Sequence, residues 1–137
     1  MSYLLDTNAC IALINGEPPR VRRRLDEILS QENAVFVSSI VLFELWYGAE
    51  KSTRQAFNRR RLEIFLAGPV STLPFEEADA EVAGQIRAQL ERLGRPIGAY
   101  DLLIAGQALR HDHVLVTANS SEFGRVKALR WEDWSKR

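Results

Sequence analysis

Near its start the chain reads Tyr3-Leu4-Leu5-Asp6-Thr7-Asn8, a short apolar run that ends abruptly in polar residues. Thr7 or Asn8 can cap a helix, because apolar residues recur at spacings of three and four over residues 9–14 before Gly16. The stretch therefore predicts a buried strand that leads directly into a helix.

The same alternation continues along the chain. Residues 34–38 (Ala-Val-Phe-Val-Ser) and 114–117 (Val-Leu-Val-Thr) are apolar on both faces, as buried parallel strands are. Shorter strands are expected at residues 70–74 and 129–131, and helices at residues 21–29, 40–48, 53–66, 76–93 and 101–109. The pattern indicates an α/β fold, with residues 1–137 forming a single domain whose mostly parallel sheet of four to five strands is sandwiched between helices.

Composition excludes several classes of protein. With 46% hydrophobic and 26% charged residues in 137, the chain is neither disordered nor a multi-span membrane protein. No apolar run approaches the ~20 residues of a membrane span, and the first residues do not resemble a signal peptide. Cys10 is the only cysteine, which excludes an internal disulfide and a cysteine-based zinc site. We therefore expect a cytoplasmic protein.

The formal net charge is zero, so the whole molecule carries no field that would attract nucleic acid. However, 15 of the 18 basic residues are Arg, the side chain best suited to binding phosphate. They include the runs Arg22, Arg23, Arg24 and Arg59, Arg60, Arg61, which could contact RNA phosphates or form a solvated helix face.

Acidic residues follow several of the predicted strands. Asp6 comes after the first strand, Glu44 lies in the helix after the second, Asp101 begins a helix, and Glu122 follows the strand at residues 114–117 together with Asn119. Sites in open parallel sheets form outside the carboxyl ends of the strands. Carboxylates that meet there repel one another unless a cation neutralises them, and a hard divalent ion, Mg²⁺ or Mn²⁺, suits oxygen ligands.

Each of these residues also has a purely structural explanation. Asp6 and Asp101 could be helix caps, Glu122 a surface residue, and Asn119 a turn residue. Glu44 is harder to explain in this way, because its neighbours in the helix are almost all apolar and a carboxylate there is costly without a partner.

Four ordered segments resemble the conserved blocks of PIN-domain nucleases, in particular the VapC toxins of bacterial toxin–antitoxin pairs. They read Leu-Leu-Asp6-Thr7-Asn8, Ser38-Ser39-Ile-Val-Leu-Phe-Glu44-Leu-Trp-Tyr-Gly48, Gly94-Arg-Pro-Ile-Gly-Ala-Tyr-Asp101 and Val116-Thr117-Ala-Asn119-Ser-Ser-Glu122. The resemblance implies an α/β/α fold, Mg²⁺- or Mn²⁺-dependent RNA cleavage and inhibition by a cognate antitoxin. It also implies homodimers, larger toxin–antitoxin assemblies, and tRNA as substrate, in particular the anticodon stem-loop of the initiator.

The resemblance carries Asp6, Glu44 and Asp101 over to the acidic positions of the family. In the fourth block, where many PIN domains have an aspartate, this chain offers Asn119 and Glu122. Asp6 and Asp101 are expected to ligate the principal ion, Glu44 to assist through water or a second ion, and Glu122 or Asn119 to position the attacking water. Of the two we favour Glu122, because it adds a negative charge. Thr7, Asn8 and Thr117 are candidate phosphate contacts, although helix-cap or strand-end roles are also open.

Other features have two interpretations. Three aromatic residues, Trp46, Tyr47 and Tyr100, could stack on unpaired bases. Trp46 and Tyr47 could instead pack in the core, form a homodimer contact or line a groove for the antitoxin. His111 and His113 are expected to face water.

Two rival functions also remain: a Mg²⁺-dependent aspartyl phosphatase or receiver-like domain, and a catalytically silent module that binds RNA or protein. The phosphatase alternative lacks a second aspartate two residues after Asp6, and the silent module does not need three acidic residues.

Overall fold

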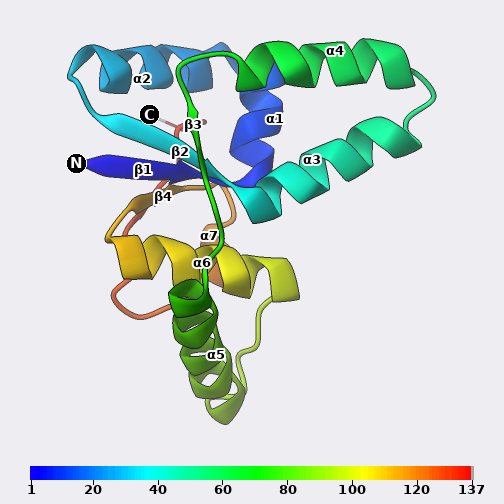
Figure 1. The fold of residues 1–137 in the computed structure, drawn as a ribbon. Coiled ribbons are helices and arrows are strands. Elements are labelled where there is room, and N and C mark those ends of the chain that lie inside the picture. The colour runs from blue at the N-terminus through cyan, green and yellow to red at the C-terminus, as the bar shows by residue number, and fades with distance from the viewer. Residues whose placement is uncertain (137) are drawn as a thin grey trace.

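One or two helices separate each strand from the next in the computed structural model, which describes residues 1–136 (Figure 1). The elements are β1 (Ser2–Leu5), α1 (Thr7–Asn15), α2 (Pro19–Ser30), β2 (Ala34–Ser38), α3 (Ser39–Lys51), α4 (Gln55–Leu66), β3 (Ser71–Leu73), α5 (Glu77–Arg92), α6 (Ala99–His111), β4 (Val114–Val116), α7 (Ser120–Phe123) and β5 (Trp131–Glu132). The predicted α/β alternation is confirmed. The last strand was placed wrongly, since it lies at Trp131–Glu132 rather than 129–131. Residues 120–123, for which the sequence predicted no helix, form the short helix α7.

All strand pairs in the sheet are parallel, in the order β3-β2-β1-β4-β5. Leu5 at the end of β1 is in register with Val37 and with Val116, and Val116 is in register with Glu132. The strands therefore end together, and the residues that follow β1, β2, β4 and β5 lie along one edge of the sheet. We call this edge the carboxyl edge.

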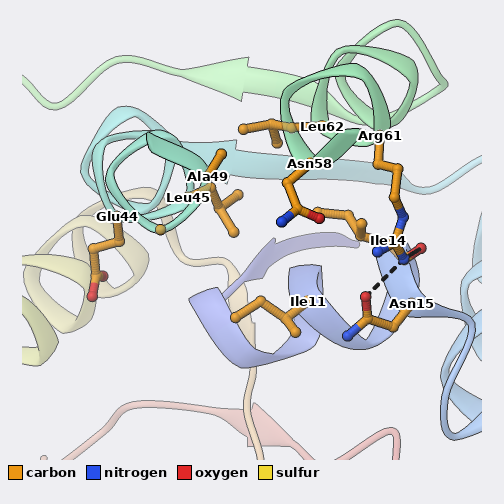
Figure 2. Close-up of a pocket in the computed structure, with 10 residues that line it drawn as sticks. Ile11, Ile14, Asn15, Glu44, Leu45, Ala49, Asn58, Arg61 and Leu62 are labelled. Atoms are coloured by element: carbon orange, nitrogen blue, oxygen red, sulfur yellow. Dashed lines mark hydrogen bonds between the residues drawn. The ribbon is translucent and has the colours of Figure 1, made fainter. Parts of the chain in front are cut away.

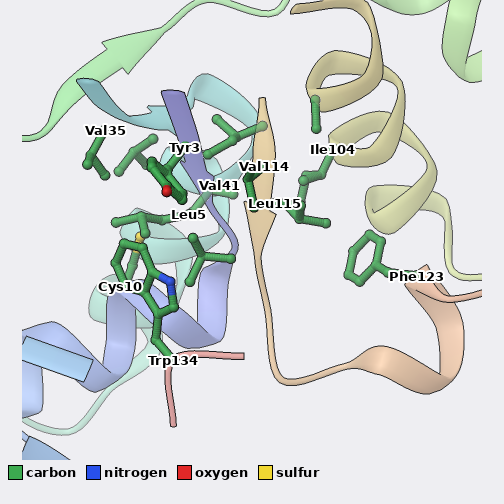
Figure 3. Packing of buried hydrophobic residues seen from close by; sticks show 14 of the residues in the cluster. Tyr3, Leu5, Cys10, Val35, Val41, Ile104, Val114, Leu115, Phe123 and Trp134 are labelled. Atoms are coloured by element: carbon green, nitrogen blue, oxygen red, sulfur yellow. The ribbon is translucent and has the colours of Figure 1, made fainter. Parts of the chain in front are cut away.

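Helices cover both faces of the sheet. Figure 1 shows α2 and α4 on one side of the strands and α5 and α6 on the other. The core between these layers includes Leu4, Leu5 and Leu115, all fully buried. Cys10 is buried as well, and Trp134 packs against Tyr3 with ring centroids 5.7 Å apart (Figure 3). The C-terminal segment is therefore anchored to the central strand.

Of the caps that the sequence allows for helix α1, the structure has Asp6 and not Thr7 or Asn8. Asp6 Oδ1 accepts a hydrogen bond from the Ala9 amide at 2.8 Å. The Asp6 amide still donates to Val116 O, so the chain turns from strand to helix within this one residue. Helix α3 is capped by Ser38, whose hydroxyl accepts a hydrogen bond from the Ile40 amide at 3.0 Å.

Helix α6 lies unusually close to α5. A Cβ atom added to Gly106 would come within 2.7 Å of the Ala83 backbone nitrogen, so only glycine fits there. The buried Asp79 completes a capping box at the start of α5 and forms an ion pair with Arg110 of α6. These contacts fix α6, which carries Asp101 in its first turn.

The prediction that both histidines face water was wrong for His113. Its ring is buried and stacks between Phe36 and His111, with centroid separations of 5.1 and 5.2 Å. Its Nδ1 atom is hydrogen-bonded to the hydroxyl of Ser2 at the beginning of β1. His113 precedes β4, so it lies at the end of the sheet opposite the carboxyl edge. Within residues 1–136, no helix has both the length and the apolar character that crossing a membrane requires.

Candidate active site

Four predicted carboxyl groups gather at the carboxyl edge, each from a different element. Asp6 is the residue between β1 and α1, Glu44 lies in α3, Asp101 in the first turn of α6, and Glu122 in α7. The charges of Asp6, Glu44 and Glu122 all raise the pKa of Asp101. The structure thus brings together side chains that the sequence separates by as many as 116 residues.

Asp6 is buried at the centre of this group. Burial raises the pKa of its carboxyl group above the ordinary value, and the charges of Glu44 and Asp133 raise it further. Hydrogen bonds from the Thr117 side chain and the Ala9 amide oppose this rise. Asp6 therefore caps α1 and belongs to the acidic cluster at the same time, so the two explanations of this residue are compatible.

Glu44 is half-buried and has a specific partner. The Thr7 hydroxyl donates a hydrogen bond to Glu44 Oε1 at 2.8 Å, which links α1 to α3. This contact explains how a carboxylate is accommodated among the apolar residues of α3. Thr7 orients an acidic side chain in this structure, although it was expected to be a helix cap or a phosphate contact.

Asp101 and Glu122 are joined by a hydrogen bond between their carboxyl groups. Burial raises the pKa of Asp101 to about 7, and the hydrogen bond and charge of Glu122 contribute, whereas the same hydrogen bond lowers the pKa of Glu122. Of the two carboxyl groups, Asp101 is therefore the one whose charged form is disfavoured. Asn119 does not replace Glu122 but bridges the pair: its Nδ2 donates to Glu122 Oε2 at 3.0 Å and to Asp101 Oδ2 at 3.4 Å.

Backbone groups hold Glu122 and Asn119 in place. The backbone N–H of Gly98 donates to Glu122 Oε1 at 3.3 Å, and the backbone N–H of Asn119 donates to the Thr117 hydroxyl at 2.9 Å. Phe123, the next residue in α7, is buried and anchors this helix in the core (Figure 3). The loop after β4 consequently turns back far enough for Glu122 to reach Asp101.

The four carboxyl groups offer the oxygen ligands that a hard divalent cation prefers. No three His, Cys, Asp or Glu side chains within residues 1–136 converge closely enough to form a ready-made metal site. The carboxyl groups instead form two neighbouring sets, Asp6 with Glu44 and Asp101 with Glu122. Both sets offer only oxygen ligands, and their mutual repulsion is the condition that a bound cation relieves.

Asn8 lines a groove that also includes Thr117 and Asp133. Several of the predicted Arg contacts are engaged within the molecule. Arg22 donates to Leu13 O at 3.4 Å, and Arg24 forms ion pairs with Glu27 and Glu132. Of the second Arg run, Arg61 donates to Ile14 O and Asn15 Oδ1, both at 2.7 Å. Much of the predicted basic surface is therefore engaged in contacts within the molecule.

A groove of about 280 Å³ begins beside Glu44 and runs between α1, α3 and α4 (Figure 2). Its lining is largely apolar, with a polar end where Arg61 meets Asn15. Neither Trp46 nor Tyr47 lines it. Trp46 is half-buried with the Arg59 guanidinium over its ring, and Tyr47 is 58% exposed.

Two features near the site were not predicted from the sequence. Asp133 directly follows β5, and its charge raises the pKa of Asp6. The rule that polar residues after strands form sites would have found Asp133 had the last strand been placed correctly. The other feature is an exposed aromatic pair, Phe43 and Tyr100, whose ring centroids are 5.9 Å apart. Phe43 directly precedes Glu44, and Tyr100 directly precedes Asp101.

Comparison with known proteins agrees with this geometry. The pattern of the PIN domain matches residues 3–129. The chain is 42% identical over 135 residues to the tRNA(fMet)-specific endonuclease VapC of Shigella flexneri, covering 98% of this chain and 99% of that protein. It is 40% identical over 136 residues to the ribonuclease VapC2 of Rickettsia felis, covering 99% and 100% respectively.

Solved structures show the same relationship. The chain is similar to VapBC2 of Rickettsia felis bound to a DNA fragment from its promoter, with a TM-score of 0.91, 40% identity, and coverage of 98% of this chain and 99% of that one. It is also similar to DNA-bound VapBC of Salmonella typhimurium, with a TM-score of 0.89, 41% identity, and 98% of each chain covered. The chain therefore belongs to the PIN-domain family and, within it, to the VapC ribonucleases.

Proposed function

We propose that residues 1–137 act as one nuclease domain, a Mg²⁺- or Mn²⁺-dependent endoribonuclease toxin that cleaves tRNA. The observation that carries this proposal is the gathering of Asp6, Glu44, Asp101 and Glu122 at the carboxyl edge. Burial, the hydrogen bond to Glu122 and the charges of the other three carboxylates together raise the pKa of Asp101 to about 7. A group of carboxylates that is unstable without a cation is what a metal-dependent phosphodiester hydrolase requires.

Each polar side chain has a proposed role. Asp6 and Asp101 would hold the principal ion, Glu44 would support it through water or a second ion, and Glu122 would position the attacking water. When bound, the ion would supply positive charge to the phosphate and lower the pKa of water. Asn119 holds the carboxylates of Asp101 and Glu122 in place through its amide group.

The proposed substrate comes from the relatives. The proteins of Shigella flexneri and Salmonella typhimurium are named tRNA(fMet)-specific endonucleases, at 42% and 41% identity. We propose initiator tRNA as the substrate here, cut in its anticodon stem-loop, and the cytoplasm as the place of action because tRNA is found there.

A cognate VapB-type antitoxin is the proposed regulator. The similar structures of Rickettsia felis and Salmonella typhimurium are VapBC complexes, both bound to DNA. The groove beside Glu44 offers an apolar surface next to the acidic cluster, so an antitoxin segment bound there would also block the substrate (Figure 2). We further propose a homodimer, with the exposed Phe43 and Tyr47 of α3 at the contact.

The test is incubation of the purified protein with initiator tRNA, elongator tRNA and a generic RNA, in Mg²⁺, in Mn²⁺ and in EDTA. We expect cleavage of initiator tRNA only with a divalent ion, leaving 5′-phosphate and 3′-hydroxyl ends because water is the nucleophile. Asp6→Asn and Asp101→Asn should each reduce the rate by at least about 100-fold while the protein stays folded.

Two controls separate the rival functions. Hydrolysis of p-nitrophenyl phosphate without RNA cleavage would indicate a phosphatase. RNA binding without any cleavage would indicate a silent binding module. Undiminished RNA cleavage in EDTA would contradict the metal-dependent mechanism.

A further inference from the structure

A second groove, which we call the α2 groove, lies between helix α2 and the C-terminal segment. Its volume is about 680 Å³. It is lined by Arg20, Arg23, Arg24 and Glu27 of α2 and by Trp131, Glu132, Asp133, Trp134 and Lys136. It is separate from the groove in Figure 2, which runs between α1, α3 and α4.

The α2 groove is connected to the acidic cluster through shared lining residues. A smaller groove of about 260 Å³ includes Thr117, whose side chain is hydrogen-bonded to Asp6, and Asn8. That smaller groove and the α2 groove both include Asp133 and Trp134. A polymer chain that passes the carboxyl edge can therefore continue along the C-terminal segment to α2.

Basic side chains remain available in the α2 groove. Arg24 binds Glu27 at 3.1 Å and Glu132 at 3.7 Å, so this one guanidinium offsets two acidic groups of the lining. By contrast, Arg20, Arg23 and Lys136 form no ion pair with any residue from 1 to 136. Three cations with this freedom can bind phosphate groups, which is the usual way in which a protein positions a nucleic acid.

An aromatic ring accompanies these cations. Trp131 in the edge strand β5 is 39% exposed, whereas Trp134 is buried and donates its indole N–H to Glu132 Oε1 at 3.0 Å. An exposed indole beside phosphate-binding side chains can stack on an unpaired base, but not on the interior of a duplex.

We propose that the α2 groove binds single-stranded RNA next to the cleaved phosphodiester, with Arg20, Arg23 and Lys136 on phosphates and Trp131 on a base. This inference rests on the proposed ribonuclease function and adds to it a route for the substrate beyond the acidic cluster. It also assigns distinct roles to the residues of the first Arg run: Arg22 and Arg24 make contacts within the protein, and Arg23 contacts RNA.

The test measures binding without cleavage. An Asp101→Asn protein is titrated against a labelled single-stranded RNA of ~15 nucleotides at several KCl concentrations, with fluorescence anisotropy as the readout. Adding Arg20→Gln and Arg23→Gln should weaken binding and lower the slope of log Kd against log salt by about 1.4, because two phosphate contacts are lost. Trp131→Ala should weaken binding by about 5- to 150-fold with the slope unchanged.

The matched control is Arg92→Gln with Arg95→Gln, which removes the same charge at the exposed C-terminal end of α5 and should leave the slope unchanged. If the α2 double variant does not fold, Lys136→Gln alone should lower the slope by about 0.7.

Three outcomes would overturn the inference. If the wild-type protein cuts RNA but the α2 and α5 double variants have equal slopes, the α2 groove does not bind RNA and the proposed function stands. If the α2 variant loses only antitoxin binding, the groove is a protein interface. If the wild type cuts no RNA and the Asp101→Asn protein binds none, the proposed function fails as well.

Discussion

Asp101 links the stability of the protein to pH. Its pKa in the folded protein is about 7, above the ordinary value of 3.8, so between these values the folded state holds a proton that the unfolded chain has released. Stability from this group is therefore present at low pH and is lost as the pH rises through about 7.

Replacing Asp101 with a neutral side chain of the same shape should remove this loss of stability at high pH. In EDTA we expect Asp101→Asn to have a higher Tm than the wild type at pH 8, with a smaller difference at pH 5, as measured by differential scanning calorimetry. Added Mg²⁺ should raise the Tm of the wild type more than that of the variant. A lower Tm of Asp101→Asn at pH 8 in EDTA would show that the carboxylate is structural.

Glu122 and Asn119 differ in what their removal should cost. Glu122→Gln removes the charge beside Asp101 and should slow RNA cleavage by roughly 10- to 1,000-fold and weaken its dependence on the metal concentration. Asn119→Ala removes two hydrogen bonds to the carboxylates and should cost less. Metal titrations of cleavage rate check both. A severe defect in Asn119→Ala with a normal titration of Glu122→Gln would reverse the assignment.

Most of the acidic cluster could be predicted from the sequence at the residue scale. Asp6 follows an apolar strand directly, and Glu44 interrupts an apolar helix, so each stands out against its neighbours. The bridging role of Asn119 could not be predicted, since it depends on the Asp101–Glu122 hydrogen bond, a contact between α6 and α7. The sequence left the cap of α1 open among Asp6, Thr7 and Asn8, because all three residues have suitable side chains.

At the scale of elements, the close approach of α5 and α6 determines where Asp101 lies. Gly106→Ala should destabilise the protein by about 1–3 kcal/mol, because the new methyl group overlaps the backbone of Ala83. Gly84→Ala is the matched control: it lies in α5 with nothing within 4 Å of the new Cβ, and should stabilise by about 0.5–1 kcal/mol. Urea denaturation measures both. Equal effects of the two substitutions would contradict this packing.

Helix α7 and the environment of His113 show where element prediction fails. Four residues are too few for helical periodicity to be read, so the Ser-Ser-Glu-Phe segment looks like a loop in the sequence. His113 looks exposed beside Arg110 and Asp112, but it directly precedes β4 and is drawn into the stack with Phe36. Both outcomes depend on contacts between distant segments.

The sheet itself could be predicted for the whole molecule, because apolar strands that alternate with helices leave few alternatives to a parallel arrangement. The sequence could not predict which Arg side chains remain available to RNA. Arg22 and Arg61, for example, donate hydrogen bonds to carbonyl groups at the end of α1. Charge runs in a sequence do not show which of their members are already bound.

Exposed aromatic residues on α3 lead to a prediction about assembly. Phe43 and Tyr47 are 56% and 58% exposed, and they lie four residues apart on one helix. We expect sedimentation to show a homodimer for the wild type and a monomer for Tyr47→Arg. A Lys127→Glu variant, changed at an exposed position far along the sequence, should remain dimeric. A monomeric wild type would contradict the dimer.

If carboxylates from separate elements form one divalent-ion site at the carboxyl edge, the protein should bind Mn²⁺ in the absence of RNA. Electron paramagnetic resonance measures the concentration of free Mn²⁺ during such a titration. We expect saturable binding to the wild-type protein, and binding weakened by at least about 10-fold in Asp6→Asn and in Asp101→Asn. Equal Mn²⁺ binding by the wild type and both variants would contradict such a site.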